Sequence, residues 1–275
     1  MKIHFRLETP DDYYAVEELT RDSFWKFWEP DRKICDEHLL VHRLRTAPTF
    51  VPELDFVAEA DGKIIGHIIY TKSKIVDDTG NEHTMLTFGP LSILPELQSK
   101  GIGKALMRHS FEEAKQLGYR AVLIFGHPDY YTRVGFRRAA EFGITTADGK
   151  NYDPFMVYVL YEDALEGIHG RYHIDPIYYQ LTETDVLEFD KRFPHKEPFV
   201  PTPFSILLDR LEPDVRKAME GAGCQSLEMM TSISQREISL LPGIDGNAIA
   251  TIRSVLSEHN IKWGEGREVN PQNEV

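Results

Sequence analysis

The 275-residue chain is poor in cysteine and has no long apolar run, and both absences exclude whole classes of protein. Two cysteines, Cys35 and Cys224, are too few for a disulfide framework, which predicts a reducing cytoplasm and argues against thiol chemistry. No stretch approaches the roughly 18 apolar residues that span a bilayer. The first residues alternate as a strand does, which excludes a signal peptide. The sequence therefore predicts a cytoplasmic protein without a membrane anchor.

Basic residues are also scarce. The chain has 31 Lys and Arg against 44 Asp and Glu, a net charge of −13. A global basic field that would attract nucleic acid is therefore absent. The acidic surface serves solubility, or it favours a cationic substrate such as an amine. With 41% apolar residues, the chain has enough material for an ordinary globular core.

The residue pattern predicts a mixed α/β domain followed by a small all-α domain. Apolar and β-branched runs predict strands at residues 3–8, 55–60, 63–72, 84–94, 121–125 and 155–160. Helices are expected from Thr9-Pro10 onwards and at residues 35–44, 103–117 and 128–134. We predict a first domain at 1–165, an extended arm at 166–203, a helical domain at 204–266 and a tail at 267–275.

The loop from Gln98 to Gly103 is the motif that points to chemistry. Two glycines between a strand and a helix let a ligand approach the backbone, and the first helix amides favour an anion such as a pyrophosphate. The third glycine of the Rossmann fingerprint and the glycine spacing of the P-loop are both missing. Taken alone, two glycines that open a helix are more often plain turn residues than a ligand site.

Several motifs occur in the order found in one enzyme family. The Q-x-x-G-x-G loop follows Leu91 to Leu94, and the segment from Tyr130 to Phe136 reads Y-Y-T-R-V-G-F. Together with the opening residues 6–12, these motifs resemble the GNAT superfamily of N-acetyltransferases, specifically its bacterial YhbS-like subgroup. The resemblance implies a mostly antiparallel sheet flanked by helices, and acetyl-coenzyme A as co-substrate without a metal.

The resemblance also implies roles for particular residues. The acetyl group would pass by direct attack to a primary amine, either a small molecule or a protein amino group. Tyr131 matches the tyrosine that protonates the departing sulfur in that family; otherwise it is a rim aromatic. The expected cofactor-binding residues are Ile93, Gln98, Ser99, Lys100, Gly101, Ile102, Gly103 and Lys104.

This chain departs from the family pattern in places. Thr87 stands where some members carry a general base, so Glu59, His67, His127, a water chain or no dedicated base remain open. Gly126-His127-Pro128 replaces a frequent asparagine. The aromatic cluster Phe24-Trp25-Lys26-Phe27-Trp28 is either an acceptor wall or helix-packing core.

The C-terminal segment 211–264 resembles a helix-hairpin-helix module, as found in the C-terminal domain of bacterial RNA polymerase α chains. From Phe204 onwards, seven Lys and Arg stand against eleven Asp and Glu, and Asp245 takes a hairpin glycine position. This charge opposes DNA binding, so protein contact or packing within the chain is favoured.

Two functions remain open. The chain is either an acetyl-coenzyme A-dependent N-acetyltransferase, or a weakly catalytic acyl-coenzyme A sensor that signals through its helical domain. Both a monomer and a homodimer are compatible with the sequence.

Overall fold

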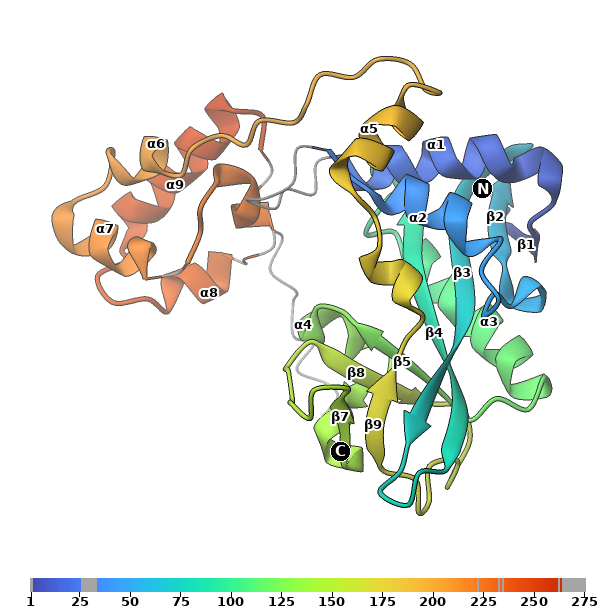
Figure 1. Cartoon of the computed structure of the whole chain (residues 1–275). Helices are drawn as coiled ribbons and strands as arrows, with labels where there is room; N and C mark the ends of the chain where they lie inside the picture. The colour runs from blue at the N-terminus through green and yellow to red at the C-terminus, as the bar shows by residue number, and fades with distance from the viewer. Residues whose placement is uncertain are drawn as a thin grey trace. The chain divides into compact units, whose positions relative to one another are not determined.

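The computed structural model describes residues 2–25, 34–221, 223–231, 233, 235–261 and 263. The chain divides into two units, Met1–Pro198 and Phe199–Val275, and each is described by itself (Figure 1). No helix among the described residues is long and apolar enough to cross a bilayer.

The first unit contains one mixed sheet, which runs in the order β1-β2-β3-β4-β5-β8-β6, with β9 pairing both β3 and β7. Only the β4–β5 and β7–β9 pairs are parallel among the described strands. This arrangement confirms the predicted fold class. The strands are β1 His4–Leu7, β2 Phe56–Ala60, β3 Lys63–Val76, β4 Glu82–Ile93, β5 Ala121–Phe125, β6 Arg137–Arg138, β7 Ile144–Thr146, β8 Phe155–Val159 and β9 Gly170–His173.

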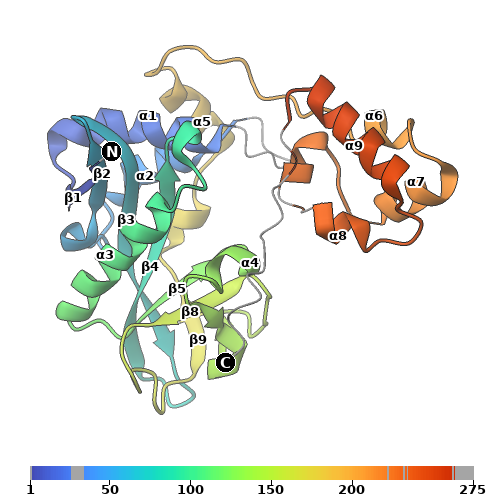
Figure 2. The same ribbon diagram turned by 180° about the vertical axis from the view of Figure 1, so that it is seen from behind.

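Helices cover both faces of this sheet. Side chains alternate along each strand, so each face presents apolar residues to the helices on its own side. Phe56 and Ala58 of β2 pack in the core with α3, whereas Val57 packs with α1 and α2. Accordingly α2 lies in front in Figure 1 and α3 in Figure 2. The helices of this unit are α1 Tyr13–Phe24, α2 Glu37–Leu44, α3 Ile102–Gln116, α4 Pro128–Tyr131 and α5 Glu183–Asp190, with 3₁₀ turns at Pro10–Asp12, Pro52–Leu54, Pro95–Leu97, Ala139–Phe142 and Pro176–Tyr179.

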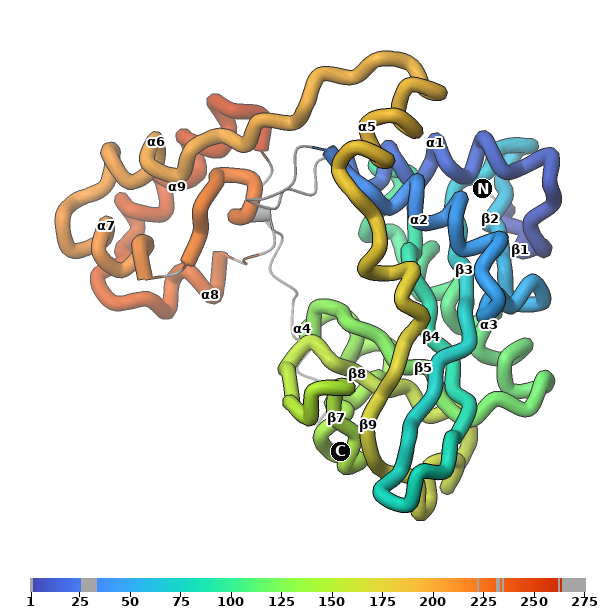
Figure 3. The backbone as a smooth tube through the Cα atoms, viewed as in Figure 1, coloured from blue at the N-terminus to red at the C-terminus, as the bar shows by residue number. Residues whose placement is uncertain are grey.

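Residues 166–203 differ from the extended arm predicted for them. They contain β9, which lies beside β3 (Figure 3), and α5, whose Asp190 binds Arg21 of α1 at 2.6 Å. Strand β9 has four residues and only Tyr172 is buried in it, so its sequence carries little apolar signal. The longest stretch of this segment without helix, strand or turn is residues 194–202, which follow α5.

The second unit is helical and has its own core. Residues such as Leu207, Met219, Ile252 and Val255 are fully buried there. Its helices are α6 Ser205–Leu208, α7 Pro213–Glu220, α8 Gln235–Ser239 and α9 Gly246–Glu258, with a 3₁₀ turn at Leu227–Thr231. The predicted tail 267–275 lies outside the described residues.

A buried ionic cluster fastens α1 and α2 to the sheet. Arg45, just after α2, donates to both carboxylate oxygens of Glu8 at 2.7 and 2.8 Å and to Glu17 of α1 at 2.7 Å. On the other side of Glu8, His67 contacts Asp55 at 2.7 Å. Burial raises the pKa of Glu8 to about 7 and that of Asp55 to about 6, while burial lowers the pKa of His67 to about 4.

The raised pKa of Glu8 predicts a pH-dependent stability. The folded chain keeps this proton up to about pH 7, whereas an unfolded glutamate loses it near roughly pH 4.3. The stabilisation is therefore complete below that lower pH and is lost as the pH rises to 7. Glu8→Gln cannot ionise, so the unfolding free energy of the wild type should fall relative to this variant by about 1–3 kcal/mol between pH 4.5 and 7.5. Urea titrations followed by circular dichroism measure this difference. If the unfolding free energies of the two proteins change with pH in parallel, Glu8 is ionised throughout and the prediction is wrong.

The separate cores predict that the first unit folds alone. A chain ending at Pro203 keeps the whole sheet and every element of the first unit. We expect it to be monodisperse, to melt cooperatively and to bind acetyl-coenzyme A with the affinity of the full chain, as measured by calorimetry. Loss of binding in a folded truncation would make the helical unit part of the cofactor site.

Candidate functional site

An irregularity in β4 marks the site. Tyr70 of β3 pairs with Phe88, but Ile68 pairs with Leu91, so β4 carries one residue more than β3 between these pairs. The extra length falls at Gly89-Pro90, which is joined by a cis peptide bond. A bulge of this kind bends a strand and ends regular pairing. The predicted strand 84–94 is therefore interrupted by a bulge at Gly89-Pro90.

Beyond this point β4 and β5 form a fork. Leu86 and Val122 are the single described pair between the two strands. Thr87, the residue in the family's base position, donates its hydroxyl to the carbonyl oxygen of Leu123 at 2.6 Å and is buried. Thr87 therefore joins the strands just before the fork opens.

The loop before α3 presents free backbone amides. Ser99 and Gly101 adopt left-handed φ angles of 62° and 83°, and Gly101 is the N-cap of α3 without any side-chain cap. The first helical bond runs from Ala105 N to Gly101 O, so the amides of residues 102–104 have no helical acceptor. Amides and helix dipole together favour an anion here.

Ile93 faces the fork with its backbone. Leu94 N donates to Ile65 of β3, and antiparallel pairing alternates, so the N–H and C=O of Ile93 point away from β3. Its carbonyl oxygen already accepts from Ser23 Oγ at 2.8 Å and Gln98 Nε2 at 3.2 Å. The expected cofactor contacts Ile93 and Gln98 thus lie together, but this carbonyl is engaged.

Tyr131 lies between the two branches of the fork. Its ring is 6.2 Å from Phe88 of β4 and 5.2 Å from Phe136. On the side of β5, a Cβ atom at Gly126 would stand 2.2 Å from the Tyr131 ring. Glycine is therefore required at position 126, which the sequence showed only as a departure from the family pattern. Burial raises the pKa of Tyr131 above its ordinary value, so its hydroxyl stays protonated.

Tyr130 places its hydroxyl beside the loop before α3. This hydroxyl would be 3.3 Å from a Cβ atom at Gly103, and Ile93 and Leu91 would be 3.6 and 3.7 Å away. Gly103 thus faces the end of β4 and the Tyr130 hydroxyl. Ser99, Lys100 and Gly101 are exposed beside it, and Lys104 donates to the carbonyl of Arg133 at 3.3 Å.

The three residues considered as general bases lie apart from one another. Glu59 accepts from Arg6 at 2.8 Å at the β1–β2 edge. His67 is fully buried against Asp55. His127 precedes α4 and its side chain is 70% exposed. Of the three, only His127 adjoins Tyr131 among the described residues, and it does so through its backbone, because the Tyr131 amide donates to the His127 carbonyl at 3.1 Å. In the described part of the chain, no hydrogen bond joins any of the three side chains to Tyr131.

The aromatic cluster is described only at its start. Phe24 ends α1 and Trp25 follows it, while Lys26, Phe27 and Trp28 lie outside the described residues. Arg21 lies 4.4 Å from the centre of the Trp25 ring. Of the two interpretations of this cluster, acceptor wall or packing core, the structure therefore bears only on Phe24 and Trp25.

One group of described residues has the composition of a metal site. Ligand atoms of Glu8, Asp55 and His67 lie within 4.8 Å of one another. Arg45, however, occupies both oxygens of Glu8. A guanidinium in that position already supplies the positive charge, so these residues form an ionic cluster.

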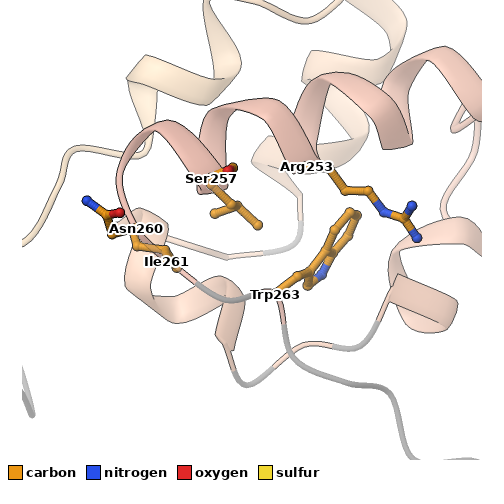
Figure 4. A pocket seen from close by; sticks show the side chains of 6 residues that line it. Arg253, Ser257, Asn260, Ile261 and Trp263 are labelled. Carbon is orange, nitrogen blue, oxygen red and sulfur yellow. The ribbon is translucent and has the colours of Figure 1, made fainter.

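The second unit holds a pocket of about 350 Å³ at the C-terminal end of α9 (Figure 4). The pocket is lined by Arg253, Leu256, Ser257, Asn260, Ile261 and Trp263.

The other end of α9 carries a carboxylate. The Asp245 side chain accepts from Ala248 N at 2.8 Å and caps this helix. The N-terminus of the second helix of the predicted hairpin is therefore negatively charged.

Known proteins share this architecture. Residues 15–136 match the profile of the Acetyltransferase (GNAT) family. The uncharacterized N-acetyltransferase YhbS of Escherichia coli (strain K12) is 30% identical over 171 residues, which are 61% of this chain and 95% of that protein. The uncharacterized N-acetyltransferase YjhQ of the same strain is 34% identical over 89 residues, 32% of this chain and 49% of that protein.

Two solved structures are similar as well. The crystal structure of Escherichia coli YhbS in complex with CoA has a TM-score of 0.57 at 26% identity, covering 66% of this chain and 94% of that one. A GNAT family acetyltransferase from Brucella melitensis in complex with acetyl-CoA has a TM-score of 0.50 at 26% identity, covering 64% and 98%.

Gly103→Asp should abolish coenzyme A binding. The new carboxylate would lie at the amides of residues 102–104 and fill the space beside Ile93 and Tyr130, so it would repel a pyrophosphate and block its approach. Calorimetry should show affinity reduced by at least about 100-fold. Gly246→Asp, in the first turn of α9, is the matched control, because a Cβ there meets nothing within 4 Å and its φ lies outside the left-handed region. Equal affinity in both variants would mean that the loop is only a turn.

Proposed function

Since the chain belongs to the GNAT family of N-acetyltransferases and takes acetyl-coenzyme A as its co-substrate, we propose that its first unit acetylates a primary amine by direct attack on the thioester. The acceptor is a small-molecule amine or a protein amino group. A cytoplasmic location remains our expectation, since Cys35 and Cys224 are both free thiols.

The observation that carries the proposal is the position of Tyr131. The ring stands in the β4–β5 fork, between Phe88 and the glycine required at position 126. The same fork ends at Ile93, whose backbone faces away from β3. These positions support a site in which the Tyr131 hydroxyl and the side of the Ile93 backbone that faces away from β3 both serve the fork.

The proposed cofactor contacts run from the loop into this fork. The amides of residues 102–104, together with Ser99, Lys100 and Gly101, would bind the pyrophosphate. The backbone of Ile93 would bind the pantetheine arm with Gln98 beside it, and Ser23 would release the Ile93 carbonyl, because its hydroxyl has a second acceptor in the carbonyl of Leu19. Since Ser23 and Gln98 both donate to that oxygen, one donor has to move when the arm binds.

The proposed reaction balances with groups at hand. The uncharged amine forms a bond to the thioester carbonyl carbon, the carbon–sulfur bond breaks, and the Tyr131 hydroxyl gives its proton to the sulfur. Because burial raises the Tyr131 pKa, the hydroxyl holds this proton until the thiolate forms. Thr87 is engaged with Leu123, so the proton of the amine leaves to water, and water returns a proton to the Tyr131 phenolate.

For the second unit we favour a protein-contact role. Its pocket combines the apolar Leu256, Ile261 and Trp263 with Arg253, which is the composition of a protein-binding surface. Asp245 at the start of α9 opposes phosphate binding at that helix end, and the acidic excess of this segment opposes DNA.

Tyr131→Phe should lower kcat by roughly 100-fold while cofactor affinity stays within about twofold, as expected for loss of a general acid. Thiol release from acetyl-coenzyme A across a panel of amines measures kcat, and calorimetry measures affinity. Tyr130→Phe is the matched control, because its hydroxyl lies at Gly103 and its loss should change affinity more than kcat.

Two results would oppose this assignment. A wild-type kcat in Tyr131→Phe would leave Tyr131 as a packing residue. Cofactor binding without thiol release for any amine would favour the alternative, an acyl-coenzyme A sensor.

A further inference from the structure

The chain segment after α5 is fastened along α1. Phe193 is buried and stacks on Tyr14 at 5.1 Å between ring centres. The Tyr14 hydroxyl donates to the carbonyl of Arg192 at 3.4 Å. Asp190, at the end of α5, binds Arg21 through two bonds of 2.6 and 2.9 Å. Residues 190–193 therefore have a fixed register on α1.

Farther along, this segment places a cation at the C-terminal end of α1. The Lys196 ammonium donates to the Asp22 carboxylate and lies 5.5 Å from the centre of the Trp25 ring. The Trp25 indole N–H donates to the carbonyl of Glu197 at 3.1 Å. The side chains of Asp22 and Lys196 are each about one-third exposed, so solvent reaches this position.

The same end of α1 adjoins the proposed reaction site. Ser23, the residue after Asp22, has its hydroxyl 2.8 Å from the carbonyl oxygen of Ile93. One turn earlier, Ser92 donates to Thr20 at 2.9 Å. Two contacts thus hold the end of α1 against the end of β4, where the pantetheine arm is proposed to bind.

A carboxylate beside an indole ring is a recognition site for an alkylammonium ion. The carboxylate forms charge-assisted hydrogen bonds, and the ring face attracts the cation. An exposed ion pair alone contributes little, but here the backbone of Glu197 fixes the indole. Arg21, the other cation near Trp25, already has Asp190 as its counter-ion.

We propose that Asp22 and Trp25 form the cation-binding end of the acceptor site, and that Lys196 occupies it as an internal stand-in for substrate. An ammonium held there has no lone pair for attack, so the acceptor carries a second, uncharged amine that reaches the thioester. The proposal rests on the proposed function and makes the acceptor an alkyl diamine. The net charge of −13 favours the approach of such a cation.

The test uses two acceptors that differ only in the anchoring group, 1,5-diaminopentane and 5-amino-1-pentanol. Asp22→Asn should raise KM for the diamine about tenfold, the equivalent of one such ionic contact, and leave the amino alcohol unchanged. Lys196→Met should lower KM for the diamine severalfold by vacating the site. The matched controls are Glu188→Gln and Lys191→Met, which break an exposed ion pair on α5 and after it and should change neither KM.

Other outcomes decide against the proposal. An equal KM change for both acceptors in Asp22→Asn would give Asp22 a structural role, and a raised diamine KM in Lys196→Met would make Lys196 part of the site. If no amine releases thiol, the proposed function fails, but calorimetry of 1,5-diaminopentane on the full chain still tests the cation site. Binding weakened by Asp22→Asn would support the site, and no binding would overturn it.

Discussion

The extra residue in β4 is the constraint on which the rest of the site depends. A regular ladder would hold β4 against β3 in one register and continue its pairing with β5. The bulge between Phe88 and Leu91 ends this continuity, and the described β4–β5 ladder stops at Leu86 and Val122. Tyr131 then enters the space between the strands. Backbone at the end of β4 is left facing the fork rather than another strand, which is what a ligand with amide groups requires.

Polar side chains in the interior fix the helix that borders this fork. Arg21 is 1% exposed and His38 is fully buried, and both contact Asp190 of α5. Removing one partner of a buried pair leaves an uncompensated charge and is strongly destabilising. The position of α1 therefore depends on a residue 169 positions later in the chain. An enzyme of this construction needs its α5 segment to keep α1 in place.

The sequence predicted what local rules determine. Strands were predicted at residues 55–60 and 63–72, and the two residues between them, Asp61 and Gly62, have positive φ angles of 50° and 73°, as a tight turn between twisted strands requires. The loop before α3 was recognisable because its two glycines are close in sequence. Gly126 was not recognisable as a positioning residue. A side chain at this position is excluded by the Tyr131 ring, and the position of that ring is set by the fold. The role of α5 was not recognisable either, because it depends on the contact between Asp190 and Arg21, which lie 169 residues apart in the chain.

The carbonyl oxygen of Ile93 links the proposed cofactor contacts to the helix that carries Asp22. Ser23 and Gln98 both donate to it, and Ser23 also lies 2.8 Å from the carbonyl of Leu19. A hydroxyl has a single proton, so Ser23 can turn to Leu19 when a ligand amide takes Ile93. The exchange would cost no hydrogen bond on α1, and it would remove a contact between β4 and that helix. If the pantetheine arm binds Ile93 as proposed, binding of the acetyl donor would thereby be coupled to the proposed acceptor end of the site through one side chain.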